Sequence, residues 1–142
     1  MIMQISSRFT IAVHILTCID YFADEHTITS DFLAGSVGVN PVIIRQVILK
    51  LKAAGLVEVS RGKTGITLSR RLEDITLYDV YEAVESVKGK LFRFHDYPNP
   101  KCPVGKNIHT ALDGSLTEIQ EALEAKMRSI TLRDTYAQAF TS

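Results

Sequence analysis

Apolar residues between positions 28 and 55 follow helical spacing twice, with a short break between the two runs. The first run covers residues 28–39 and closes around Gly38. The second opens with Asn40 and Pro41, a favourable N-cap residue followed by a proline suited to the first helical position. It ends before Gly55, and its apolar positions recur at a 3.6-residue period: Ile44, Val47, Ile48 and Leu51. This pattern predicts two short helices joined by a tight turn.

Two strand-like runs follow these helices directly. They cover residues 56–60 and 66–69, and the connection between them carries Arg61 and Lys63. This order predicts a β-hairpin with cations at its tip. A helix-turn-helix followed by such a hairpin is a winged helix-turn-helix, a fold that places one helix in a DNA groove.

Further elements flank the predicted winged module. A first helix opens at residues 6–7 and ends near Asp24. Residues 76–79 resemble a capping box with aspartate in place of glutamate, and predict a helix that ends at Gly89. Residues 90–103 hold three of the chain's four prolines, which predicts a loop rather than a helix or strand. No internal repeat is evident.

The last long element carries an apolar seam close to a heptad repeat. Its members recur at intervals of three or four residues: Ile108, Leu112, Leu116, Ile119, Leu123, Met127 and Ile130. Such a seam lets two helices bury one stripe against each other, and two-fold proteins suit palindromic operators. A core helix of a single domain would show the same stripe. We favour a dimerisation helix, because polar residues flank a narrow seam.

Charge placement adds to this interpretation, although the 142-residue chain has no net charge. Residues 40–71 contain seven cations and one acid, Glu58, a local net charge of +6. Binding to phosphates draws on such local positive charge, because it releases the counterions of the DNA. An ordinary solvated face is the alternative explanation.

Composition excludes several classes of function. No run approaches the roughly 18 apolar residues that cross a bilayer, and the first residues lack the pattern of a signal peptide. The two cysteines lie 84 positions apart, which implies no disulfide scaffold and suits a reducing cytoplasm. No glycine-rich phosphate loop, nucleophile elbow, CxxC pair or carboxylate dyad is present. We therefore expect a cytoplasmic protein that is not an enzyme and makes no membrane contact.

Several segments together resemble one family of bacterial transcriptional regulators, the Rrf-two family. The resemblance covers nearly the whole chain. It is carried by the opening QISSRF with AVH, the recognition helix and first wing strand VNPVIIRQVILKLKAAGLV, the wing residues RG and GITL, and ITLYDV after the wing, at residues 4–9, 12–14, 39–57, 61–62, 65–68 and 75–80. It implies a homodimeric winged-helix protein, usually a repressor, with a sensory loop before a long helix.

The predicted sensory loop departs from members that sense through an iron–sulfur cluster. Those members carry three cysteines across the loop, whereas Cys102 is the only cysteine here. His95, Asp96 and His109 supply too few soft ligands for a metal. The segment 98–105 instead resembles the loop of cluster-free members, so we predict no cofactor and no metal.

Cys102 is then the candidate redox sensor. Pro103 suits the first position of a helix, so Cys102 is expected at a helix N-terminus, where the partial positive charge and the neighbouring Lys101 and Lys106 favour the thiolate. A structural cysteine that never reacts is the alternative. Cys18, on the first helix, is either a buried inert thiol or a resolving cysteine.

The predicted DNA-contacting residues come from the recognition helix, the wing and the start of the chain. Arg45 and Gln46 can make bidentate contacts to base edges, and Val42 can meet a thymine methyl group. The predicted set is Asn40, Pro41, Val42, Arg45, Gln46, Lys50, Arg61, Lys63 and Arg8.

These predictions give a mainly α protein with a small β-hairpin wing and a long C-terminal dimerisation helix. We expect a winged helix-turn-helix DNA-binding domain over residues 1–89, a sensory loop over 90–104, and the dimerisation helix and tail over 105–142. The partners would be a double-stranded DNA operator and a second copy, bound through residues 105–130. The expected function is a repressor whose DNA affinity changes on oxidation of Cys102. A same-fold repressor with a small-molecule effector, and a protein-interaction module that does not bind DNA, are the alternatives.

Overall fold

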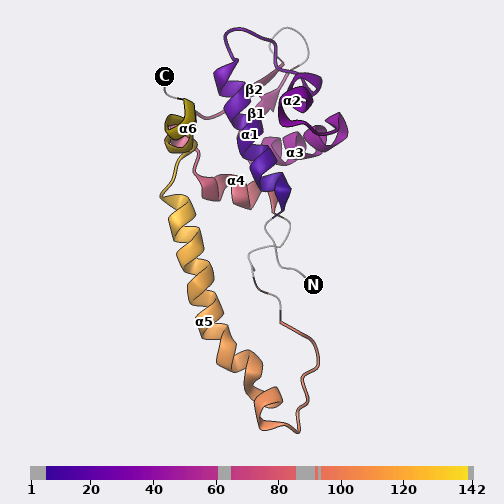
Figure 1. Ribbon diagram of the computed structural model, residues 1–142, viewed down its shortest axis with the longest axis vertical. Coiled ribbons are helices and arrows are strands. Elements are labelled where there is room, and N and C mark those ends of the chain that lie inside the picture. The colour runs from indigo at the N-terminus through magenta and orange to yellow at the C-terminus, as the bar shows by residue number, and fades with distance from the viewer. Residues whose placement is uncertain (1–5, 61–64, 86–91, 93, 141–142) are drawn as a thin grey trace.

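The computed structural model describes residues 6–60, 65–85, 92 and 94–140. In chain order the described elements are α1 (Ser7–Tyr21), α2 (Ser30–Val37), α3 (Pro41–Ala53), β1 (Val57–Val59), β2 (Ile66–Leu68), the 3-10 turn η1 (Leu72–Asp74), α4 (Leu77–Val84), α5 (Pro103–Arg128) and α6 (Leu132–Phe140). All elements except α5 gather at one end of the molecule, and α5 extends away from them as a long arm (Figure 1). This confirms the predicted winged helix-turn-helix with a hairpin wing and a long C-terminal helix.

Side-chain caps determine where α2 and α3 begin. The Thr29 hydroxyl accepts a hydrogen bond from the Phe32 N–H at 3.0 Å, so α2 begins at Ser30 and not at residue 28 as predicted. Gly38 ends α2 with a φ of 83°, and Asn40 caps α3 as predicted, by accepting from the Val42 N–H at 2.8 Å. No single helix in the described part of the chain is long and apolar enough to cross a membrane; α2 and α3 reach that length and composition only as a pair bent by 110°.

The core forms around α1 and the inner face of α3. Ile15, Leu16 and Ile19 of α1 are buried against the predicted apolar face of α3, all four members of which are buried: Ile44, Val47, Ile48 and Leu51. Because the buried side of α3 is apolar throughout, burial of that side orients the opposite side of the helix toward solvent.

The wing is a short antiparallel hairpin. Val57 pairs with Leu68 and Val59 with Ile66. Both strands are shorter than predicted, and residues 61–64, including the predicted tip residues Arg61 and Lys63, lie outside the described residues. Gly65 has a φ of 63° and forms an isolated bridge with Ile28; a side chain at this position would collide with the Ile28 carbonyl.

The ends of two further helices differ from the prediction or fall outside the described residues. The first helix ends at Tyr21, with Phe22 as its C-cap, and not near Asp24. The helix after the wing ends at Val84, whereas the predicted end, Gly89, lies outside the described residues.

The long helix ends earlier than the apolar seam predicted. Ser129 is the C-cap of α5, so Ile130 is not on this helix; its carbonyl accepts a hydrogen bond from the Leu77 N–H at 2.9 Å. A further helix, α6, which was not predicted, then begins at Leu132. The 3.6-residue pattern alone could not show this end, because Ile130 continues the apolar spacing although it lies beyond the helix.

A repeated five-residue sequence joins α6 to the rest of the fold. ITLYD at residues 75–79 opens α4 and ITLRD at residues 130–134 opens α6, which corrects the expectation that the chain has no internal repeat. The segments pair antiparallel through Thr76 and Thr131, and the Leu132 N–H donates to the Ile75 carbonyl at 2.8 Å.

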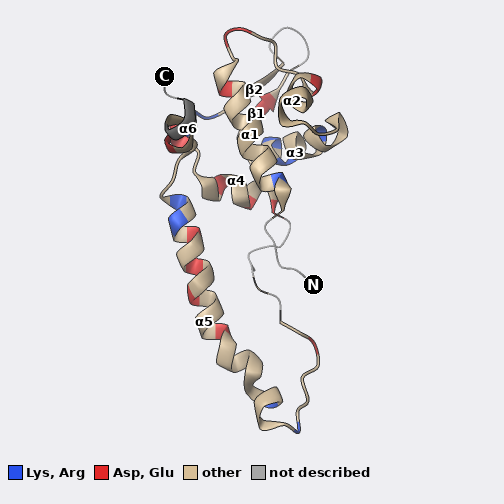
Figure 2. Ribbon diagram, viewed as in Figure 1, with Lys and Arg blue, Asp and Glu red and all other residues tan. Residues whose placement is uncertain are grey.

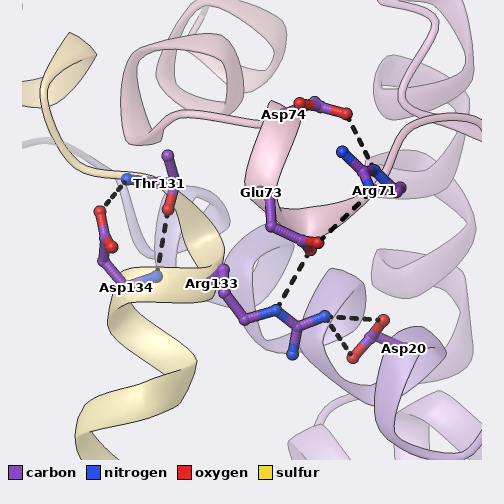
Figure 3. Close-up of polar contacts among 7 residues, drawn as sticks. All are labelled: Asp20, Arg71, Glu73, Asp74, Thr131, Arg133 and Asp134. Atoms are coloured by element: carbon purple, nitrogen blue, oxygen red, sulfur yellow. Dashed lines mark hydrogen bonds and ion pairs between the residues drawn. The ribbon is translucent and has the colours of Figure 1, made fainter.

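Each copy of this repeat carries its own capping box. Thr76 and Asp79 exchange side-chain to backbone hydrogen bonds of 2.9 and 3.1 Å at the start of α4. Thr131 and Asp134 do the same at 3.0 and 3.1 Å at the start of α6 (Figure 3). The two helix starts are therefore held side by side while their first N–H groups are satisfied.

Arg133 fastens α6 to the DNA-binding unit by charge. Its guanidinium lies 3.4 Å from Asp20 of α1 and 3.2 Å from Glu73 of η1 (Figure 3). Leu132 beside it is fully buried in the same core cluster as α1 and α3. The predicted domain boundaries stay a prediction, but α6 packs with the core of the winged unit.

Candidate nucleic-acid interface

The outward side of α3 presents four neighbouring side chains. Val42 is 51% and Leu49 66% exposed, and Arg45 and Gln46 are exposed between them. Their positions i, i+3, i+4 and i+7 place them on one face of the helix, opposite the buried residues. We call Val42, Arg45, Gln46 and Leu49 the recognition face. Leu49 was missing from the predicted set, although its position seven residues after Val42 places it there.

Asn40, Pro41 and Lys50 lie at the margins of this face. Asn40 is exposed but its Oδ1 is engaged in the cap of α3, and Pro41 is half-buried. Lys50 is half-buried on the side of α3 that faces α4, where it lines a cleft with Arg70, Asp79 and Glu82. Lys50 is therefore placed beside the recognition face and not on it.

Arg8 reaches the recognition face from a different helix. Its Nη2 donates to Gln46 Oε1 at 3.3 Å. Arg45 lies 4.0 Å from Asp31 of α2, and both of these side chains are well exposed. Solvent weakens such a pair, so Arg45 is available for another anionic or acceptor partner.

Charge is separated along the molecule. Lys and Arg colour α3 and the first turn of α1, whereas Asp and Glu follow the middle of α5 (Figure 2). The cations of the predicted tip, Arg61 and Lys63, lie outside the described residues, and the described cations at α3 and the start of α1 include the exposed Arg8, Arg45 and Lys52. A DNA backbone would approach this side and not the acidic arm.

Cys102 is the N-cap residue of α5 and Pro103 the first residue of the helix, as predicted. The half-buried thiol makes no capping hydrogen bond. The backbone N–H groups of Gly105 and, to a lesser extent, Val104 nevertheless lower the pKa of Cys102 below that of an ordinary thiol, because they stabilise the thiolate.

The segment before α5 is held against the first turns of that helix. The Asn99 carbonyl accepts from the Cys102 N–H at 3.1 Å, and a Cβ on Gly105 would lie 2.5 Å from the same carbonyl oxygen. Farther along, His109 Nε2 lies 3.0 Å from the His95 carbonyl oxygen. Gly105 is thus required by a close backbone approach, which sequence reasoning did not detect.

Cys18 lies in a different environment from Cys102. It is buried in α1, and its Sγ lies 3.2 Å from Ser36 Oγ, which is also 2.9 Å from His14 Nε2. Helix α1, in the winged unit, and the first turn of α5 lie at opposite ends of the molecule (Figure 1). Within one chain the fold does not bring the two cysteines together.

The donor groups do not fit an iron centre. Cys102 is the only cysteine of the loop, and no group of three or more His, Cys, Asp or Glu side chains suited to a metal occurs in the described part of the chain. One thiolate cannot hold an iron–sulfur cluster of the kind that cysteines ligate. No step of the function is therefore assigned to iron.

Some residues of the apolar seam of α5 are buried within the chain, and others are exposed to solvent. Met127 is buried, whereas Leu112 and Ile119 are 38% and 51% exposed. Leu116 contributes to a cleft of about 360 Å³ between α5 and the preceding segment, which is also lined by Tyr78, Phe92, Phe94, Asp113 and Glu124. Two of the six seam residues on α5, Leu112 and Ile119, are therefore left exposed, and the other four are buried or half-buried.

A winged helix-turn-helix whose second helix exposes such a face defines a DNA-binding protein. The family model Rrf2, described as iron-dependent transcriptional regulator, matches residues 5–138. The chain belongs to the Rrf2 family, and is a DNA-binding transcriptional regulator and not an enzyme.

Similar proteins agree with this membership. YwnA of Bacillus subtilis (strain 168), named as an HTH-type transcriptional regulator, is 41% identical over 137 residues, which span 96% of this chain and 100% of YwnA. A crystal structure described as that of a DNA-binding protein shares 36% identity and a TM-score of 0.73, and covers 91% of this chain and 98% of its own. CymR (YrzC), the global cysteine regulator of B. subtilis, has a TM-score of 0.71 over 97% of this chain and 99% of its own, but at 19% identity it shows the fold alone.

Proposed function

We propose that this regulator is a homodimeric repressor of the cluster-free branch of its family, that it acts in the cytoplasm, and that oxidation of Cys102 changes its affinity for a two-fold operator. The observation that carries the DNA-binding part is the recognition face: four exposed side chains on α3, opposite a fully apolar buried side. A helix built in this way is suited to the major groove.

The predicted contacts other than Gln46 each have a part in this proposal. Arg45 binds a guanine edge, and Val42 packs on a thymine methyl. Asn40 and Pro41 lie at the end of α3 that enters the groove. The flanking cations contact phosphates or, from the wing, the minor groove: Arg8, Lys50, Arg61 and Lys63.

Arg45→Ala tests the recognition face. Loss of a bidentate contact to guanine is expected to weaken binding to the operator by roughly tenfold to a hundredfold, while the melting temperature stays unchanged because Arg45 is exposed. Gel-shift titrations measure the affinity of each protein for the operator and for a random duplex. The matched control is Lys106→Ala, which removes an exposed cation from the start of α5. Equal losses in both variants would contradict the assignment.

The exposed part of the α5 seam supports the proposed dimer. Leu112 and Ile119 are accompanied on this side by small exposed residues, Ala111, Ser115 and Ala122. Small residues let two helix backbones approach closely, and large apolar residues supply the area to bury. In this arrangement the α5 helices of two copies pack together and set the distance between two recognition faces.

The proposed redox step uses Cys102 and a peroxide. The thiolate attacks one peroxide oxygen of hydrogen peroxide, the O–O bond breaks, and sulfenic acid and hydroxide result. A second thiol converts the sulfenic acid into a disulfide with release of water. Either product changes the group at the start of α5, where Asn99 and Gly105 are in close contact. A change there alters the packing of the proposed dimer helix.

The lowered pKa makes this proposal testable by pH. We expect the rate of alkylation of Cys102 by iodoacetamide to reach half its maximum at a lower pH in the folded protein than in the urea-unfolded chain, because the α5 backbone amides stabilise the thiolate only in the fold. Peptide mass spectrometry measures the two profiles. Peroxide should change operator affinity in the wild type and in Cys18→Ser, but not in Cys102→Ser; a response that survives in Cys102→Ser would refute the sensor role.

A small-molecule effector is the second candidate signal. The cleft of about 360 Å³ between α5 and the preceding segment combines aromatic and carboxylate side chains, which is a composition suited to a small ligand. A regulator of this kind would respond to its ligand equally in the wild type and in Cys102→Ser. The same pair of proteins therefore separates the two signals.

A further inference from the structure

Arg8 and Gln46 meet where the start of α1 lies against α3. Arg8 Nη2 donates to Gln46 Oε1 at 3.3 Å, and both side chains are exposed. Arginine carries N–H donors and no acceptor, so this contact decides which end of the Gln46 amide faces Arg8. The oxygen is turned toward the guanidinium, and the amide nitrogen is left to donate to another group.

The backbone that carries Arg8 is anchored on both sides. The Ser6 hydroxyl accepts from the Arg8 N–H at 3.1 Å, and the Ser6 N–H donates to Glu85 Oε1, beyond the end of α4, at 3.2 Å. Phe9, the next residue, packs its ring edge-on against Tyr81 of α4, with the centroids 6.5 Å apart. Arg8 therefore reaches Gln46 from a point that is fixed relative to the core.

Gln46 lies between two exposed aliphatic side chains on the same face. Val42 is one turn before it and Leu49 about one turn after it, at 51% and 66% exposure. In the major groove thymine presents an acceptor, O4, beside a methyl group, and no other base offers that pair. An amide N–H donor flanked by aliphatic groups matches thymine.

Adenine fits the same arrangement poorly. Its usual partner is a glutamine that accepts from N6 and donates to N7 at once. Here the Gln46 oxygen already accepts one hydrogen bond from Arg8, and an N6 amino group that used its second lone pair would place a donor beside the Arg8 guanidinium.

We propose that Arg8 is a positioning residue that holds Gln46 as a hydrogen-bond donor, and that this pair makes the recognition face read thymine rather than adenine. The inference rests on the proposed binding of an operator through α3. It gives Arg8 a part in sequence preference, in addition to contact with the phosphate backbone.

The first experiment locates the base that Gln46 reads. Duplexes selected by the wild-type protein from a random library define the operator, and the position whose preference disappears in Gln46→Ala is the contact. We expect thymine over adenine there by about tenfold. Replacement of that thymine by deoxyuridine, which lacks the methyl group, should weaken binding by about fourfold. A preference for adenine at this position would overturn the inference.

The second experiment tests Arg8. In Arg8→Ala the amide of Gln46 is free to turn, so the preference for thymine over adenine should fall several-fold. Arg8→Lys, which keeps a charged donor, should retain most of that preference. If Arg8 only contacts phosphate, Arg8→Ala weakens binding to all sequences alike and the preference is unchanged, which would refute the positioning role.

These outcomes separate the inference from the proposed function. Selection that enriches no sequence would show that α3 does not read DNA bases, and the proposed function and the inference would fail together. An enriched operator with the same base preference in wild type and Arg8→Ala would defeat the inference alone. Arg8 and Gln46 are exposed, so the three variants should fold like the wild type. Melting curves of all four proteins check this.

Discussion

Ile119→Lys is expected to convert the proposed dimer into monomers and to abolish operator binding. Ile119 is 51% exposed on α5, on the side away from the loop, where a second copy would cover it. A lysine ammonium in that apolar contact would be desolvated without a partner, which should raise the dimer dissociation constant by about a hundredfold or more. Loss of the dimer removes one of two half-site contacts, so operator affinity falls with it.

The matched control introduces the same residue on the other side of the helix. Glu121 is exposed and lies half a turn from Ile119, beside the loop cleft. Glu121→Lys should leave the dimer intact. Sedimentation velocity across a range of protein concentrations measures the association, and gel shifts measure the binding. A dimeric Ile119→Lys would show that this face of α5 is not the interface.

Leu132→Ala is expected to lower the stability of the whole winged unit. Leu132 of α6 is fully buried in the core cluster that also contains α1 and α3. Truncation of a buried leucine costs about 3 kcal/mol of unfolding free energy. For a chain of this size the melting temperature should fall by roughly 10 °C, with protomer concentration held equal because dimerisation adds to apparent stability.

Leu49→Ala is the control for this substitution. It removes the same atoms from a side chain that is 66% exposed, so the melting temperature should stay close to that of the wild type. The two variants also separate stability from recognition, because only Leu49 is on the recognition face. A Leu132→Ala protein that melts like the wild type would mean that α6 folds apart from the winged unit, as a tail.

Local signals explain why so much of α3 was predictable. Asn40 caps the helix, Pro41 occupies its first position, and the buried residues recur at the helical period. Each of these depends on neighbours within a few residues, so they can be read without knowing the fold. The predicted apolar face is the buried face, and Arg45 and Gln46 consequently lie on the outer side.

The predictions failed where a residue's role depends on contact with a segment that is distant in the sequence. Ile130 continued the apolar seam in the sequence, but it lies beyond α5, where its carbonyl accepts a hydrogen bond from the N–H of Leu77 in α4. The two ITLxD segments are 55 residues apart, and only their antiparallel pairing shows why both are present. Gly105 likewise reads as an unfavourable helix residue until Asn99 is found against it.

The sequence by itself determined the fold class, the start and the buried face of α3, and the position of Cys102 at a helix N-terminus. Caps, glycines and apolar periods act over one or two turns and need no tertiary contact. Only the tertiary structure decided that α6 packs on the winged unit and that the Arg8 side chain contacts Gln46. Such contacts join segments that are far apart in the sequence, and a local pattern carries no information about which distant segments pack together.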